Sequence, residues 1–206
     1  MCLRLSGNGI LAVQEEQLTA TVQKLDPRAE RTRSALMRAF NSLVLSRGYD
    51  GVMPVDVAEV AGVARSTLYE HFAGKEDMLR QSMLPILKPL AECVGSVHTP
   101  PRLELVLEHI RSSRRMAREL LNGRTRTVAA RTLAELIEAR LEHVPASRPA
   151  MPRTFIAAYL ANGILGLIDE WLSGREACSA AVLASALQAT THAAAAAARS
   201  GEARSR

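Results

Sequence analysis

The amino-acid sequence predicts an all-α fold, on three observations. Apolar residues make up 48% of the 206 residues and recur at three- and four-residue spacing along much of the chain. Aromatic residues make up only 3%, and alternating runs of β-branched residues, which mark strands, are almost absent. Glycine and proline separate the helical patterns from one another. The apolar content is enough for a core in one compact unit or two small ones.

The first strong helical pattern follows an amino-terminal stretch over residues 1–26. We expect this stretch to be an arm outside the core, because it holds Gly7 and Gly9 and only a weak helical pattern. From Pro27 the apolar positions fall on one face, which predicts an amphipathic helix that ends near Gly48. These positions are Ala35, Leu36, Ala39, Phe40, Leu43 and Val44.

Two short helical patterns around Gly62 follow, between Pro54 and Lys75. Small apolar residues give the first pattern a face that can lie close under a second helix; they are Val57, Ala58 and Ala61. Gly62 permits the left-handed turn that joins two helices through a few residues. Larger apolar residues bury one edge of the second pattern: Val63, Leu68 and Phe72. The pattern is that of a helix-turn-helix unit, which reads DNA.

The nineteen residues 61–79, AGVARSTLYEHFAGKEDML, resemble the DNA-binding domain of the TetR family of bacterial transcriptional regulators. The usual pattern of that family is AGVS-x-x-x-(L/F)-Y-x-(H/Y)-F-x-x-K-E-x-L. The resemblance implies an amino-terminal arm over 1–26, a three-helix helix-turn-helix domain over 27–75, and a helical effector-binding and dimerisation domain over 76–206. It also implies a homodimer that binds an operator in double-stranded DNA and responds to an unidentified small-molecule effector.

Two positions depart from the family pattern. Ala64 stands where the family usually has Ser, and it cannot accept the unpaired amide hydrogen bonds of the next helix. About 1 kcal/mol of capping energy is then missing, unless Ser66 or a DNA phosphate supplies the acceptor. Pro54 follows Met53 where relatives often place a Thr cap, and proline is acceptable at a first helical position.

The resemblance assigns DNA contacts to the outward side chains of the second short helix. Arg65 and Thr67 are expected to read bases, because an arginine can bond guanine through two donors. Phosphate contacts are expected from Ser66, Tyr69, His71 and Lys75. Tyr69 and His71 could instead be packed rings with a wet polar tip, and Lys75 an ordinary solvated charge. The arm is either a disordered tail or, through Arg4 and Lys24, a further DNA contact.

A fourth helix is expected from Glu76 and Asp77, whose charges suit the positive end of a helix dipole. Pro85 and Pro89 fall inside it and each removes an amide donor. Either the helix bends there, as a joint that transmits motion, or it ends early. The loop over residues 95–101 then gives the best domain boundary.

Four helical patterns fill the remainder: Arg102 to about Leu121, with a potential break near Ser112 and Ser113; Thr125 to His143; Pro152 to Ser173; and Cys178 to Arg199. The pattern from Pro152 is apolar nearly all round, so the helix should be buried on more than one side. One side can face a second copy, as in the dimer bundle of the TetR family, or the whole helix is the core of one monomer. The expected interface residues are Gly163, Leu167, Trp171, Leu183 and Leu187.

The effector pocket is expected to be mostly apolar with a few polar anchors. Its candidate residues are His109, Met116, Phe155, Tyr159 and Asn162. Asn162 lies in an apolar helix, so its buried amide should bond a ligand, a water, the backbone or its symmetry mate. An arginine cluster on one helical face either attracts an anionic ligand or is solvated and paired with Glu108 and Glu119. Its members are Arg111, Arg114, Arg115 and Arg118.

The three cysteines, Cys2, Cys93 and Cys178, are widely spaced, which favours reduced thiols in a cytoplasmic protein over disulfides or a zinc site. Cys93 is either a packing residue or a redox sensor. The longest apolar stretch, about fourteen residues interrupted by Asn162, is short of the roughly twenty that a membrane span needs. The amino end shows no secretion signal. We expect no cofactor and no metal.

Taken as a whole, the sequence predicts a DNA-binding transcriptional regulator, a repressor that an effector releases from a near-palindromic operator. An enzyme is disfavoured, because the chain has no phosphate-binding glycine loop, no HExxH motif and no paired histidines. No catalytic residue is therefore assigned. The alternative is a helical ligand-binding dimer that has lost its affinity for DNA.

Overall fold

The structure, a computed structural model, describes residues 26–142, 151–175 and 177–199. Every regular element in these ranges is a helix, which confirms the all-α fold. The helices are α2 (Pro27–Arg47), α3 (Pro54–Ala61), α4 (Arg65–His71), α5 (Lys75–Glu92), α6 (Leu103–Ser112), α7 (Arg114–Leu120), α8 (Gly123–Glu142), α9 (Arg153–Ser173) and α10 (Ala180–Arg199). Arg4, Lys24 and Cys2 lie outside the described residues, and so does most of the expected arm.

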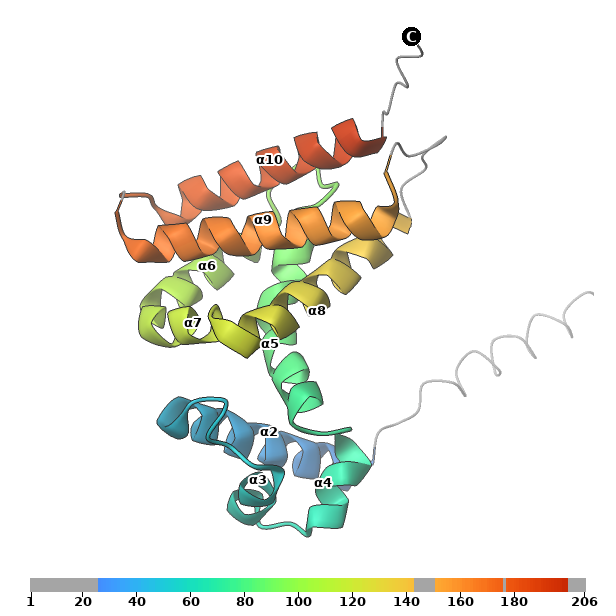
Figure 1. Cartoon of the computed structure of the whole chain (residues 1–206), viewed down its shortest axis with the longest axis vertical. Coiled ribbons are helices and arrows are strands. Elements are labelled where there is room, and N and C mark those ends of the chain that lie inside the picture. Colours follow the sequence, from blue (N-terminus) through green and yellow to red (C-terminus); the bar gives the residue numbers. More distant parts are fainter. Residues whose placement is uncertain (1–25, 143–150, 176, 200–206) are drawn as a thin grey trace, which may run out of the picture.

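Helices α2, α3 and α4 form a small three-helix unit at one end of the molecule (Figure 1). Asp26 opens α2, where its Oδ1 accepts a hydrogen bond from the Arg28 amide at 2.9 Å. Gly62 ends α3 with φ 69° and ψ 33°, the left-handed conformation that the sequence predicted for the turn. Fully buried side chains from all parts of the unit meet in its centre: Leu36, Phe40, Val57, Leu68 and Phe72.

Helix α5 leads from the three-helix unit into the larger helical layer above it (Figure 1). It runs without interruption from Lys75 to Glu92 and includes both Pro85 and Pro89, so the expectation that it ends early is wrong. Buried apolar residues on each side of the prolines hold it to its neighbours; they are Met83, Leu87 and Leu90. This burial offsets the two missing amide donors.

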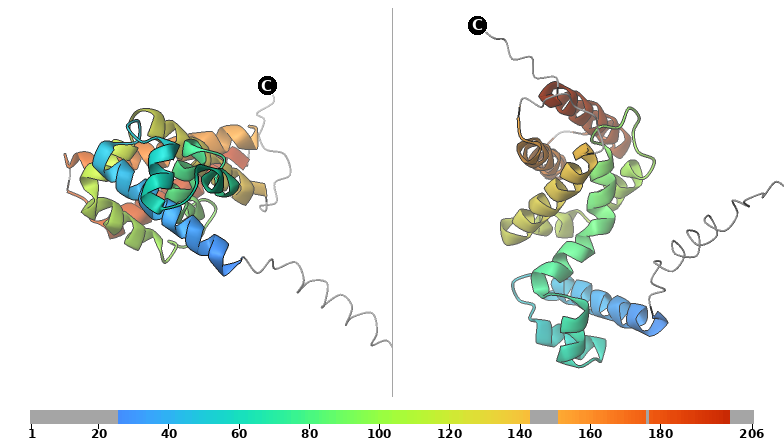
Figure 2. Two further views of the ribbon diagram at one scale, coloured as in Figure 1. Left: turned by 90° about the horizontal axis from the view of Figure 1, so that it is seen from below. Right: turned by 90° about the vertical axis from the view of Figure 1, so that its right-hand side faces the viewer.

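The larger layer is built on α5, α8 and α9. Helix α5 packs on α8, and α8 packs on α9. Helices α6 and α7 occupy the pattern that begins at Arg102, with a break where Ser112 and Ser113 suggested one. The backbone leaves the helical region at Ser113, with φ −104° and ψ 31°. Helices α9 and α10 lie side by side along the outer edge of the layer (Figures 1 and 2). Helix α10 also packs on α6.

Among the helices of the described residues, α9 meets the length and composition that a membrane-crossing helix needs. The 21 residues of α9 exceed the apolar run that the sequence suggested. Buried residues occur along its whole length, and 44% of its most apolar window is inside the protein. A core helix in a folded domain has these same properties.

Candidate nucleic-acid interface and effector cavity

The short helix α4 is fixed against the rest of the three-helix unit by two buried apolar side chains, Leu68 and Phe72. Arg33 of α2 adds a second restraint. Its Nη1 donates a hydrogen bond to the carbonyl oxygen of His71 at 3.0 Å, and its guanidinium lies 4.4 Å from the centre of the Phe72 ring. This contact satisfies a carbonyl at the end of α4. It joins residues 38 positions apart, so no local pattern in the sequence could have identified it.

The outward face of α4 carries the residues that the sequence assigned to DNA. Arg65, Ser66 and Tyr69 are exposed, and Thr67 and His71 are half-buried. The Arg65 guanidinium lies over the Tyr69 ring at 5.6 Å, and its Nη2 approaches the Tyr69 hydroxyl at 3.5 Å. The Tyr69 side chain is 45% exposed. The arrangement presents a cation and three hydroxyl groups on one short helix.

The first turn of α4 lacks a side-chain cap, as the sequence suggested. Ala64 has the extended backbone of a cap residue, with φ −66° and ψ 150°, but no side-chain hydrogen bond. The start of α3 does have a capping contact, because Asp56 Oδ2 accepts a hydrogen bond from the Met53 amide at 3.1 Å. The amides at the start of α4 therefore stay available to an external acceptor.

Lys75 points back into the protein rather than only toward solvent. Its Nζ lies 4.3 Å from the centre of the Tyr49 ring and donates to the Asp50 carbonyl oxygen at 3.4 Å. Burial, and next the negative charge of Glu76, raises the pKa of the Tyr49 hydroxyl. Lys75 thus ties the start of α5 to the turn between α2 and α3, a contact that the sequence did not reveal.

The five residues expected to line an effector pocket do not come together. Phe155 and Tyr159 are 64% and 70% exposed on the outer face of α9, and His109 is exposed on α6. Met116 instead lines a groove between α7 and the turn after α2. Asn162 is exposed, and its Nδ2 donates to the Ala158 carbonyl oxygen at 2.9 Å. Of the partners expected for Asn162, the backbone is the one that the structure shows, and the residue lies on the outward face of α9 rather than inside the chain.

An apolar cavity does lie inside the larger layer, among α5, α6, α7, α8 and α9. Its lining residues are Met83, Ile86, Leu87, Leu90, Ile110, Ala117, Leu120, Leu121, Ala129, Leu165 and Ile168. Its volume is about 70 Å³, well below the roughly 300 to 1,000 Å³ of small-molecule sites. The cavity would have to widen to hold a ligand. Four of its lining residues belong to α5, the helix that leads to the three-helix unit.

The five residues expected at a dimer interface divide into three groups. Gly163 and Leu167 are exposed on the outer face of α9. Leu183 and Leu187 are buried inside the chain, because α10 turns them toward its own layer, so the expectation that they meet a partner is wrong. Trp171 is half-buried, and its indole N–H donates to the Cys178 carbonyl oxygen at 2.9 Å.

Cys93 is completely buried at the end of α5, where its Sγ donates to the Pro89 carbonyl oxygen at 3.7 Å. Burial raises the pKa of the thiol to about 12. A thiol that stays protonated is a poor nucleophile, which favours packing over redox sensing. No group of three or more His, Cys, Asp or Glu side chains suited to a metal ion occurs in the described part of the chain.

Comparisons with known proteins agree with this geometry. Residues 36–81 match the family model described as bacterial regulatory proteins, tetR family. An HTH-type transcriptional regulator of Bacillus subtilis (strain 168), YxbF, is 36% identical over 59 residues, which are 28% of this chain and 16% of that protein. The match therefore spans about a sixth of the length of this relative.

Two solved structures share the fold over most of the chain. A TetR-family regulator from Streptomyces coelicolor A3 superposes with a TM-score of 0.59 and 22% identity, covering 84% of this chain and 98% of that one. A TetR transcriptional regulator from Streptococcus agalactiae 2603V gives a TM-score of 0.52 and 20% identity, covering 88% and 99%. The tetR-family match thus covers residues 36–81, and the likeness to the two solved structures shows the fold of the chain, a helix-turn-helix unit with a helical carboxy-terminal layer.

Proposed function

We propose that the protein is a homodimeric repressor that binds a near-palindromic DNA operator through α4 and leaves it when a small molecule binds. The observation that carries this proposal is the outward face of α4. Arg65, Ser66 and Tyr69 project from a helix that buried Leu68 and Phe72 hold in place. A rigid short helix with exposed hydrogen-bonding residues at its start suits insertion into the major groove.

Within this interface Arg65 and Thr67 read bases, and Ser66, Tyr69 and His71 contact phosphates. Arg65 already lies along Tyr69 in the free protein, so less side-chain freedom is lost on binding. Lys75 contributes positive charge near the backbone of the DNA while it holds the Tyr49 ring. The uncapped amides after Ala64 are free to bond a phosphate.

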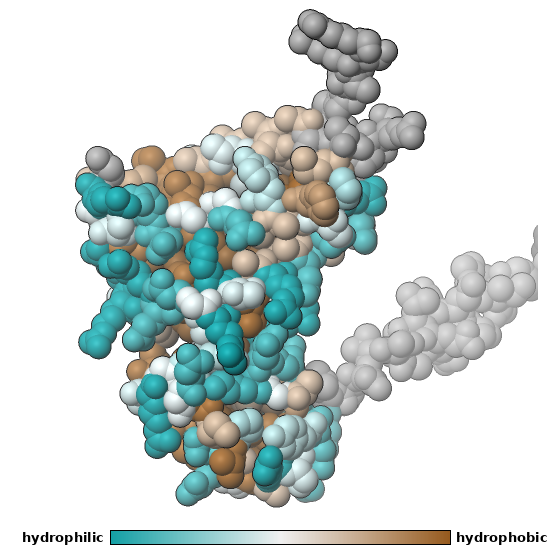
Figure 3. Space-filling model, viewed as in Figure 1, coloured by the Kyte–Doolittle hydropathy of each residue, from teal (hydrophilic) through white to brown (hydrophobic). Residues whose placement is uncertain are grey.

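The proposed dimer forms through the outer faces of α9 and α10, which no other part of the described chain covers. Exposed apolar and small residues continue from one helix to the next: Phe155, Ala158, Tyr159, Gly163 and Leu167 on α9, and Ala181, Val182, Ala186 and Ala189 on α10. A Cβ placed on Gly163 would meet nothing within 4 Å, so a partner helix has room to approach. Brown and pale residues follow these helices in Figure 3. A twofold axis there would present two copies of α4 to two half-sites.

The effector binds the apolar cavity beside α5. A ligand that widens this cavity presses on Met83, Ile86 and Leu87, which stand on the helix that carries the three-helix unit. Ion pairs join the first turns of α5 to α8, from Glu76 to Arg131 at 3.2 Å and from Arg80 to Glu135. A displaced α5 would therefore change the spacing of the two α4 helices, and with it the affinity for the operator.

The test is an electrophoretic mobility shift with the protein's own upstream intergenic DNA and a random duplex, each at two salt concentrations. Arg65→Ala should lose preference for the specific duplex, by about 10- to 100-fold for one bidentate base contact, and keep most of its affinity for random DNA. Arg102→Ala, an exposed arginine of the upper layer, is the control and should behave as the wild type. Equal losses on both duplexes for Arg65→Ala would contradict its assignment as a base reader.

The same experiment tests the alternative function, a helical ligand-binding dimer without DNA affinity. The missing cap at Ala64 is the observation that favours it. A dimer in solution that shifts no duplex from its own locus at low salt would select this alternative.

A further inference from the structure

Five guanidinium groups gather where α6, α7 and the end of α9 meet, a region that we call the basic corner. Its members are Arg111, Arg114, Arg115, Arg118 and Arg175. They line two neighbouring surface hollows of about 540 and 400 Å³, which share Arg114. Hydrophilic residues cover the α6 and α7 side of the molecule in Figure 3. The corner is separate from α4 and from the residues that line the apolar cavity.

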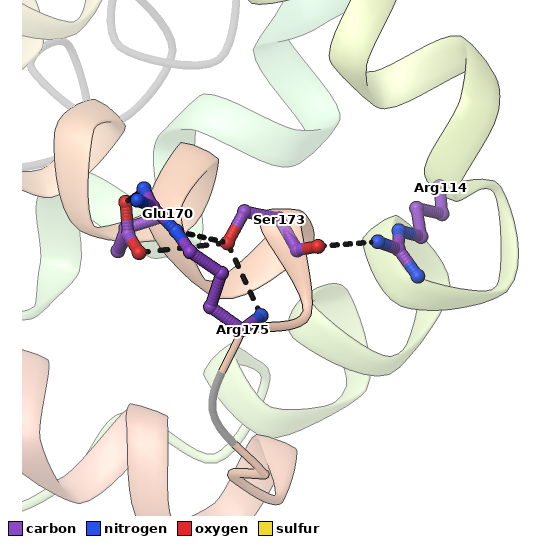
Figure 4. A network of polar contacts seen from close by, with 4 residues as sticks. All are labelled: Arg114, Glu170, Ser173 and Arg175. Carbon is purple, nitrogen blue, oxygen red and sulfur yellow. Dashed lines mark hydrogen bonds and ion pairs between the residues drawn. The ribbon is translucent and has the colours of Figure 1, made fainter.

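Contacts with the end of α9 hold several of these groups in place. Arg114 Nη2 donates to the carbonyl oxygen of Ser173 at 2.7 Å, and Arg175 Nε donates to the Ser173 hydroxyl at 3.3 Å (Figure 4). A Cβ on Gly174 would stand only 2.9 Å from Arg114 Nη2, so glycine leaves room for the guanidinium. Arg111 lies 5.7 Å from the centre of the Trp171 ring. Arg111, Arg114 and Arg175 are thus positioned before any ligand arrives.

The basic corner holds more positive than negative charge. Glu119 is the acidic residue that lines the hollows, and Glu170 is paired with Arg175. The expected pairing of the arginine cluster with Glu108 and Glu119 is not among the ion pairs of the described residues. Arg111, Arg115 and Arg118 likewise have no carboxylate partner there. Residue 176, next to Arg175, lies outside the described part.

We infer that the basic corner binds a small anion with two or more phosphoryl groups. The planar donor fork of arginine fits phosphate oxygens in pairs, and Arg is preferred to Lys where such geometry matters. Because the two hollows share Arg114, they suit a ligand with two neighbouring anionic groups better than a ligand with a single anionic group. The bound anion would join α7 to the end of α9 through Arg114, at a site distinct from the effector cavity.

Trp171 offers a direct readout, because it is the single tryptophan of the chain and lines one of the hollows. The experiment titrates the full-length protein, without DNA, with pyrophosphate and follows tryptophan fluorescence. The wild type should give a saturable change. Arg115→Glu/Arg118→Glu should bind at least about tenfold more weakly, since two charge-assisted contacts are lost. Both residues are exposed, so the fold is retained, which circular dichroism checks.

A matched control separates a site from general charge attraction. Arg28→Glu/Arg31→Glu reverses the same number of charges at exposed positions of α2 and should leave pyrophosphate binding unchanged. The inference is overturned by any of three results: no response of the wild type to pyrophosphate, equal weakening in both double variants, or equally tight binding of citrate. Loss of duplex DNA binding in Arg115→Glu/Arg118→Glu without a pyrophosphate response would overturn it as well. The three pyrophosphate and citrate outcomes do not depend on whether α4 binds an operator.

Discussion

Single side chains decide how α4 is held against the rest of the three-helix unit. Arg33 restrains the end of α4 through the His71 carbonyl and the Phe72 ring, and Lys75 restrains the start of α5 through Tyr49. Both contacts place a cation on an aromatic face, which is worth about 0.5 to 1 kcal/mol at exposed sites. They restrain the carboxy-terminal end of α4 and the start of α5 that follows it, while Arg65 remains at the outward face of α4.

At the same scale, Cys93 should resist alkylation in the folded protein. Only the thiolate attacks iodoacetamide, and the pKa of this thiol is raised to about 12. At pH 8 the half-buried Cys178 should be labelled before Cys93, as mass spectrometry of peptides would report. Labelling of Cys93 as fast as Cys178 without unfolding would show that the thiol is accessible.

The same thiol makes stability depend on pH in the alkaline range. The folded pKa lies above the ordinary value of 9.0, so the contribution to stability is complete below pH 9 and falls as the pH rises toward 12. As the pH rises, the thiol of the unfolded chain loses its proton before that of the folded chain. The free energy of unfolding therefore falls by up to about 1.4 kcal/mol per pH unit. Denaturant unfolding of the wild type and of Cys93→Ala at pH 8 and 10 should show a smaller loss in the variant.

Among the helices, α4 offers a single substitution that should stabilise the folded protein. Ala64→Ser would give the first turn its missing acceptor, because the backbone there already has cap geometry. The expected gain is about 0.5 to 1 kcal/mol in the free energy of unfolding, measured by thermal or denaturant unfolding. Ala73→Ser, at an exposed position outside the first turn, should change little. No gain from Ala64→Ser would show that water already satisfies these amides.

The positions of the helices along the chain were largely predictable from sequence. Which face of each helix is buried, and against which neighbour, was not. Periodicity located α2, α3, α4, α8 and α9 to within a few residues, and the two serines marked the break between α6 and α7. Pro85 and Pro89 were misleading, because burial of α5 on its neighbours outweighs local helix propensity. Leu183 and Leu187 were placed on the wrong face, since which side of an apolar helix meets its own layer depends on contacts far apart in sequence.

For the whole molecule, the proposed dimer depends on the outer face of α9. Tyr159→Glu places a charge on the face that we propose to be buried between two copies, and burial of an unpaired charge costs several kcal/mol. The variant should be monomeric in analytical ultracentrifugation, whereas the wild type should be a dimer. Leu105→Glu, at a 65% exposed position of α6, is the control. A dimeric Tyr159→Glu variant would place the interface elsewhere.

Because α5 is unbroken, a small tilt at one end moves its other end by a larger distance. Leu87 lines the cavity, and Lys75 stands twelve residues earlier on the same helix, about 18 Å away at 1.5 Å per residue. A tilt of about 6° around the cavity would then move the start of the helix by about 2 Å. If the proposed effector widens the cavity, this long arm would turn a small local displacement into a misfit between the two α4 helices and the DNA groove.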